Sequence, residues 1–183
     1  MDQLYGHLCN RLPGNQDTTQ PIFIKDNTLY EHPLFTINYT SYDLRQEHDA
    51  VHLKYGSKGI LVYSPTTPGP EPWLYACVIA IYHAFIYTEA NPVAKRVELL
   101  WVRWMQWEPL HLMGPNISKN YTRILFIPQS GIPGEVFGFV DPSHVIHGCH
   151  LLPVYALNRT HNRLGASMFR DEGGDWQAFY ANR

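Results

Sequence analysis

Four potential metal ligands lie close together in one short segment: His144, His147, Cys149 and His150 in SHVIHGCHLL. Zinc sites in proteins combine such nitrogen and sulfur ligands in a tetrahedron. Along a strand, side chains alternate, so His147 and Cys149 would face one way and the other two the opposite way. One face then offers at most two ligands, and no second Cys/His pair follows at a suitable spacing. We therefore expect a half-buried strand, with no metal and no cofactor.

Covalent catalysis would need a nucleophile, a base and an orienting group. Cys149 beside His147 or His150 has the residue types, but the sequence shows no helix N-terminus or basic surroundings that would lower the thiol pKa. None of Ser64, Ser130 and Ser167 lies in a G-x-S-x-G turn. We therefore expect a protein that is not an enzyme, and a metal-dependent enzyme is the least favoured alternative.

Three tryptophans, Trp101, Trp104 and Trp107, are spaced by three residues in WVRWMQWEP. On a strand, Trp101 and Trp107 would share one face and Trp104 would lie on the other. The exposed face of an indole can hold an ammonium group or stack on a base, whereas a buried one simply fills the core. This segment is the first candidate for a binding surface.

Basic residues are enriched in the second half of the chain. Residues 1–91 carry 5 basic and 9 acidic side chains, whereas residues 92–183 carry 9 and 7. A nucleic-acid site would draw on this half, with Lys119, Arg123, Arg159 and Arg163 as the candidates. The same side chains can equally form an ordinary solvated face.

The composition limits the class of protein. The chain has 183 residues, 45% of them hydrophobic and 16% charged, with a net charge of −2. This supports a folded core and excludes both general disorder and a strongly basic nucleic-acid clamp. Three cysteines fit a reducing compartment. The sequence shows no apolar run long enough for a membrane span and no signal-peptide pattern, so we expect a nuclear or cytoplasmic protein without membrane contact.

Short β-branched and aromatic runs separated by turn residues predict a mainly β protein. The clearest are Trp73–Tyr87 and Val97–Trp104, which flank a polar turn and indicate a β-hairpin; a helix over Leu74–Tyr87 is the alternative. Further strands are expected over 35–39, 60–63, 123–127, 136–140 and 145–155.

Other segments carry weaker signals. Residues 10–34 are expected to be an irregular lead-in, 43–49 a polar stretch and 158–174 a loop. Asp175 is positioned to cap a short C-terminal helix over Trp176–Ala181.

The order of pieces after about residue 60 resembles a BAH (bromo-adjacent homology) domain. The matching segments are ILVYSPTTPGPEP, WLYACVIAIY, VRWMQWEP, EVFGFVDPSH with VIHGCHLLPVY, and DWQAFY. The resemblance implies a distorted small antiparallel β-barrel over 58–183, preceded by a partly irregular N-terminal extension over 1–57. It also implies a module for protein–protein contacts, often in chromatin.

Some BAH domains read methylated lysine in an aromatic cage. Carried over, one cage wall falls on Trp104, a second on the non-aromatic Gln106, and a third on Leu74 between Trp73 and Tyr75. The resemblance thus makes Trp104, Trp73 and Tyr75 the candidates for an aromatic pocket, with Tyr63 as a weaker member.

A second resemblance covers about residues 35–181. The segments TINYTSYDLRQEHD and DWQAFY are similar to a segment of transposable-element-associated (Plavaka- and KDZ-like) proteins of mushroom-forming fungi. The expected function is a non-catalytic interaction module, linked to chromatin or to a transposable element, that binds a protein partner or a histone tail. The alternative is a nucleic-acid-binding accessory domain of a transposase-related protein.

Overall fold

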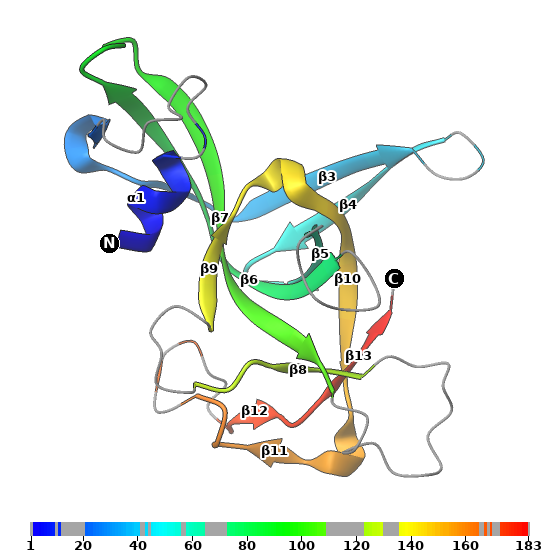
Figure 1. Cartoon of the computed structure of the whole chain (residues 1–183). Coiled ribbons are helices and arrows are strands. Elements are labelled where there is room, and N and C mark those ends of the chain that lie inside the picture. The colour runs from blue at the N-terminus through cyan, green and yellow to red at the C-terminus, as the bar shows by residue number, and fades with distance from the viewer. Residues whose placement is uncertain are drawn as a thin grey trace.

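The computed structural model describes residues 2–9, 11, 21–40, 43, 45–55, 58–64, 73–108, 123–129, 136–164, 167, 169 and 173–182. Over these residues the chain is mainly β, with an α-helix near the N-terminus (Figure 1). The predicted fold class, a mainly β protein built on antiparallel strands, is confirmed.

The elements alternate short strands with brief helical turns. Up to residue 63 they are α1 (Asp2–Cys9), β1 (Ile22–Ile24), η1 (Lys25–Asn27), β2 (Tyr30–His32), β3 (Leu34–Thr40), β4 (Gln46–His52) and β5 (Gly59–Tyr63). After it they are β6 (Trp73–Thr88), β7 (Lys95–Trp107), β8 (Arg123–Phe126), β9 (Phe137–Val140), η3 (Pro142–His144), β10 (Val145–Pro153), η4 (Tyr155–Leu157), β11 (Arg159–Thr160), β12 (Asp175–Trp176) and β13 (Phe179–Asn182).

The predicted hairpin forms the long axis of the molecule. β6 and β7 pair antiparallel from Tyr75 opposite Met105 to Ile86 opposite Lys95. Their β-branched and aromatic residues favour a pleated, half-buried surface. Backbone hydrogen bonds between Thr88 and Asn91 close the turn, with N–O distances of 3.1 and 3.2 Å. In Figure 1 the green hairpin crosses the whole molecule, so both of its faces are available to other elements.

The large sheet curls around on itself. In order across the sheet, its strands are β1, β6, β5, β10, β13, β8, β7 and β9. In addition, β6 pairs with β2 and with β7. Pairing therefore runs around six strands and returns to β6. The expected small barrel is corrected nonetheless: the sheet is not a closed barrel, and β8 and β13, of 4 residues each, pair with each other at only two positions. Strands this short leave the circuit joined by few pairs.

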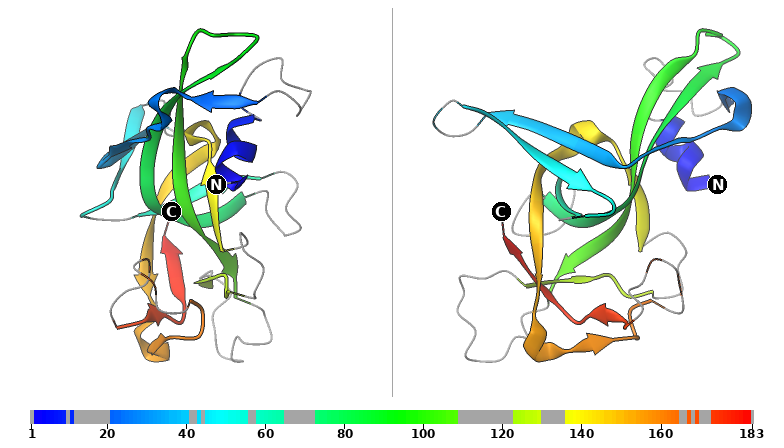
Figure 2. Two further views of the ribbon diagram at one scale, coloured as in Figure 1. Left: turned by 90° about the vertical axis from the view of Figure 1, so that its left-hand side faces the viewer. Right: turned by 180° about the vertical axis from the view of Figure 1, so that it is seen from behind.

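The N-terminal elements are more ordered than the sequence indicated. β1 and β2, within the expected irregular lead-in, pair with β6. β3 and β4 form a separate hairpin that projects from the large sheet (Figure 2). β4 and α1 had not been expected. In β4 only Val51 is buried, so its sequence shows no apolar alternation that would identify a strand.

The expected C-terminal helix is wrong. Asp175 and Trp176 form β12, which pairs with β11, and Phe179–Asn182 form β13, which pairs with β10 and β8. The carboxylate of Asp175 does not cap a helix because it is held by Arg103 on β7. Long-range strand pairing and this ion pair therefore override the local capping signal.

Three buried clusters cover different parts of the β6–β7 hairpin. The first core joins Val78 and Val102 to β3, β4, β5 and β10. The second core joins Ala84 and Leu99 to Leu8 of α1. The third core covers the open end of the hairpin; its members are Leu61, Tyr75, Met105, Ile124, Phe126, Cys149 and Phe179.

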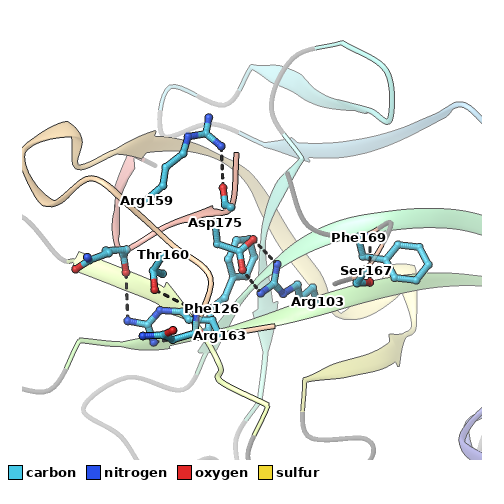
Figure 3. A network of polar contacts seen from close by, with 11 residues as sticks. Arg103, Phe126, Arg159, Thr160, Arg163, Ser167, Phe169 and Asp175 are labelled. Atoms are coloured by element: carbon cyan, nitrogen blue, oxygen red, sulfur yellow. Dashed lines mark hydrogen bonds and ion pairs between the residues drawn. The ribbon is translucent and has the colours of Figure 1, made fainter. Parts of the chain in front are cut away.

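A buried ion pair connects the middle of β7 to β12. The Nη1 and Nη2 atoms of Arg103 donate to the two carboxylate oxygens of Asp175, at 2.8 and 2.6 Å (Figure 3). The side chains are only 2% and 3% exposed. The Arg103 guanidinium also lies 3.8 Å from the ring centre of Phe126. Both charges are largely removed from water, so each depends on the other.

Asp175→Asn should lower the free energy of unfolding by about 3–5 kcal/mol, because it leaves the Arg103 charge buried without its counter-charge. Urea unfolding of the purified protein measures this. Glu98→Gln is the matched control, since Glu98 pairs with Arg96 at 3.0 Å on the exposed surface; it should cost less than about 1 kcal/mol. Equal effects of the two substitutions would contradict the role assigned to the buried pair.

Candidate functional site

Two of the four predicted aromatic residues line one cavity. Tyr63, at the end of β5, and Trp104, on β7, both border a cavity of about 530 Å³. Leu74 borders it as well, at the position to which the BAH resemblance assigned a cage wall. We call this cavity the aromatic pocket. Its lining side chains are His7, Arg11, Val62, Tyr63, Ser64, Leu74, Trp104, Phe139, Val140, Asp141 and His144.

The other two predicted residues lie elsewhere. Tyr75 is 1% exposed in the third core, where its ring meets that of Trp107 edge-on at 5.5 Å. Trp73 is half-buried and packs against the same core. Tyr75 and Leu74 are adjacent in the strand, so their side chains point to opposite faces of the sheet. Alternation thus separates Tyr75 from the pocket that Leu74 lines.

The same alternation distributes the three tryptophans as predicted. Trp104 packs on the first core, whereas Trp107 packs on the third core on the opposite face. Trp101 meets the ring of Phe169 edge-on at 4.7 Å. Only Trp104 of these three lines the aromatic pocket.

Gly138 on β9 fixes where the Trp104 ring lies. Val102 is paired with Gly138, which places the glycine beside Trp104 on the same side of the sheet. A Cβ atom added to Gly138 would be 2.5 Å from Nε1 of Trp104. The indole therefore occupies the space that any other residue at position 138 would need.

Asp141 supplies the carboxylate of the pocket. It precedes the short helical turn η3 and accepts a hydrogen bond from the backbone N of Ser143 at 2.8 Å. Nε of Arg11 lies 2.7 Å from its Oδ2 atom. Burial acts to raise the pKa of Asp141, but the hydrogen bonds from Ser143 and the charge of Arg11 outweigh it, so the pKa lies below 3.8. The carboxylate is therefore ionised at neutral pH.

His7 of α1 closes the pocket on the side of β9. Its ring centre lies 6.1 Å from that of Phe139. Burial, followed by the charge of Arg11, lowers the pKa of His7 below its ordinary value of 6.5, although Asp141 opposes the shift. The lowered pKa favours the neutral form of His7, whereas Arg11 and Asp141 form an ion pair at the pocket.

A second, larger cavity of about 980 Å³ lies against the other face of the hairpin. Its walls include Trp101, Trp176 and the Arg103–Asp175 ion pair. Arg103 and Asp175 compensate each other's charge there, and Glu31 and Lys58 also border this cavity. The sequence-predicted pocket residues do not line it.

The His/Cys segment does not gather its members. His147 lies 3.7 Å from the carboxylate of Asp49, Cys149 is 3% exposed in the third core, and His150 is exposed. In the part of the chain that the structure describes, no three His, Cys, Asp or Glu side chains are placed to hold a metal ion.

The predicted nucleic-acid residues are used within the fold. Arg123 is 5% exposed and paired with Glu108. Arg159 stacks on Trp176 at 4.5 Å and donates to the carbonyl oxygen of Gly174. Arg163 donates to the carbonyl oxygens of Phe126 and Gln177 (Figure 3). Lys119 lies outside the described residues. The three described arginines thus have internal partners, and they give the nucleic-acid alternative no support.

Sequence reasoning missed His7, Arg11, Phe139 and Asp141. A signal was present in the segment Asp141-Pro142-Ser143, since Asp followed by Pro is typical of a helix start and could have marked a fixed carboxylate. The other three residues carry no local signal, because α1 and β9 bring them to the pocket from distant parts of the chain.

Comparisons with protein families, with curated proteins and with solved structures found no match to this chain. The BAH resemblance and the resemblance to transposable-element-associated proteins therefore stay predictions. Among the described residues, no helix has the length and apolar character needed to span a membrane.

Gly138→Ala should displace the Trp104 indole and destabilise the protein by about 1–3 kcal/mol, as over-packing does in other cores. Urea unfolding and the tryptophan fluorescence spectrum report the two effects. Gly6→Ala is the control, because a Cβ at this helical glycine meets nothing within 4 Å; it should be neutral or slightly stabilising. A Gly138→Ala protein with unchanged stability and spectrum would contradict the tight contact.

Proposed function

We propose that this chain is a non-catalytic interaction module that binds a protein partner and takes a basic side chain of that partner into the aromatic pocket. The carrying observation is that Tyr63, Trp104, Phe139 and Asp141, from three separate segments, line the same cavity. Three aromatic residues and one ionised carboxylate border this cavity, and such groups have the chemistry for an ammonium or methylated ammonium group.

The energetics favour such a ligand over a neutral one. An ammonium group over an aromatic ring gains about 0.5–2 kcal/mol per contact, the larger values applying where water is excluded. Tyr63 is 51% exposed, so its ring can be reached from solvent. Trp104 is half-buried and held in place by Gly138. Trp104 thus forms a fixed wall inside the pocket and Tyr63 an accessible wall near solvent, an arrangement that suits the insertion of a long side chain.

The setting of this binding rests on the resemblances. A BAH-like module implies a nuclear role with a histone tail as the partner, and the fungal resemblance implies an association with transposable elements. The location of Trp104 and Leu74 in the pocket supports the BAH version, since the family's cage walls fall on those positions. Gln106, the remaining position of the family's cage, is not among the described lining residues.

Two observations support a role without catalysis. Cys149, the candidate nucleophile, is almost entirely buried in an apolar core. An apolar environment raises the pKa of a thiol and makes it inert. His147 is turned toward Asp49 and Tyr39 instead, with the Tyr39 and His147 ring centres 4.5 Å apart.

Histone-tail peptides carrying unmodified, mono-, di- or trimethylated lysine test this proposal by calorimetric titration. At least one peptide should bind, and Tyr63→Ala should weaken it by about 2- to 30-fold, the loss of one cation–π contact. Tyr55→Ala is the control, because Tyr55 is 77% exposed and does not line the pocket. Binding that Tyr63→Ala leaves unchanged, or no binding of any peptide, would refute the histone-tail form of the proposal.

A further inference from the structure

The N-terminal segment contributes a cation to the aromatic pocket. Arg11 lies beyond the end of α1 and borders the same cavity as Trp104 and Tyr63. Its Nε atom is 2.7 Å from Oδ2 of Asp141, and its Nη1 atom donates to the carbonyl oxygen of Glu98 at 2.8 Å. The side chains of Arg11 and Asp141 are 22% and 12% exposed. This ion pair is therefore largely shielded from water and from screening by salt.

Asp141 is the one carboxylate among the described lining residues of the pocket. With Arg11 in place, its negative charge is already compensated. A cationic ligand therefore meets no uncompensated carboxylate among these residues. It gains the full electrostatic attraction of Asp141 only if Arg11 gives that carboxylate up.

We propose that Arg11 is an internal occupant of the acidic end of the pocket and that a cationic ligand competes with it for Asp141. This inference rests on the proposed function and adds to it how the site is regulated. The chain's own guanidinium also indicates the class of ligand, a positively charged side chain that bears either N–H donors or methyl groups. The affinity for the ligand then depends on how much more favourably the ligand's cation interacts with the Asp141 carboxylate than Arg11 does.

Arg11 is free to exchange because other contacts hold α1. Leu4 and Leu8 of the helix are 6% and 0% exposed, and they belong to the second core together with Ala84, Ile86, Val97 and Leu99. Burying two leucines contributes about 1.5–3 kcal/mol each. The helix can therefore stay docked while the Arg11 side chain turns away from Asp141.

The test uses N-acetyl-trimethyllysine methylamide as the probe, and NMR of the 183-residue chain follows its binding. Arg11→Gln should tighten binding at least about 5-fold, the lower end of typical coupling between sites. Asp141→Asn should weaken binding, and adding Arg11→Gln to Asp141→Asn should restore nothing, because the contested carboxylate is gone. Arg45→Gln is the control: it removes the same charge from a side chain that is 78% exposed, and affinity should stay within about 2-fold.

Two readouts on the protein itself guard against a variant that merely misfolds. In the wild-type protein, saturating probe should shift the Nε–H resonance of Arg11. In Arg11→Gln, the pKa of His7 should rise toward 6.5, because the charge of Arg11 helps to lower it. A folded Arg11→Gln protein that binds the probe no more tightly than wild type overturns the competition.

The failures of the two proposals are distinguishable. If wild-type protein binds the probe and Tyr63→Ala weakens it, but Arg11→Gln does not tighten it, only the competition is wrong. If neither wild type nor Arg11→Gln binds the probe, the cationic pocket is refuted and the competition with it.

Discussion

Side chains alternate along the paired strands β6 and β7, and this alternation decides what every other element can contact. Val102 and Trp104 point to the first core, whereas Arg103 and Met105 point to the opposite face. The hairpin is long enough for each face to be divided among several partners: the helix α1, the curled strands β5, β8, β10 and β13, and the projecting hairpin of β3 and β4. The aromatic pocket exists because Trp104 and Leu74 lie on faces that these partners leave partly open.

Three ion pairs among the described residues join distant segments of the chain. Arg103 with Asp175 and Arg123 with Glu108 are buried pairs between distant segments. Breaking either leaves a charge in a poorly solvating environment, so these pairs act as constraints on register rather than as sources of large net stability. The pair of Arg11 and Asp141 differs because it borders a cavity. In the proposed competition, a cationic ligand replaces Arg11 at Asp141, so this ion pair affects ligand binding as well as stability.

Local patterns in the sequence were sufficient for the central hairpin. Dense β-branched and aromatic residues on both sides of a short polar turn favour a β-hairpin over the alternative helix. The placement of Trp104 on the face opposite Trp101 and Trp107 follows from the two-residue period of a strand. The short strands β8, β9 and β10 were found for the same reason. By contrast, β4 has one buried residue, and α1 is held by contacts with β6 and β7 some 80 positions away, as between Leu8 and Ala84. Neither leaves a periodic apolar signal.

Long-range contacts explain the remaining differences. A capping aspartate and an aromatic tail favoured a terminal helix, but Arg103 lies 72 positions before Asp175 and takes its carboxylate. The residues that border the cavity differ from the predicted set for a similar reason. Trp104 and Tyr63 were chosen from their residue types and the BAH resemblance and both border the cavity, whereas Asp141 and Arg11 reach it only once β9 and α1 have docked. Tyr75 lies one position along the strand from Leu74, which is enough to place its side chain on the other face of the sheet.

The most direct test of a cation-binding aromatic pocket is an NMR titration that follows the indole N–H signals of all five tryptophans while a trimethyllysine peptide is added. The pocket predicts that the Trp104 signal shifts in a saturable way while those of Trp101, Trp107 and Trp176 stay in place. Saturable shifts confined to Trp101 and Trp176, which border the larger cavity, or no saturable shift at all, would contradict it.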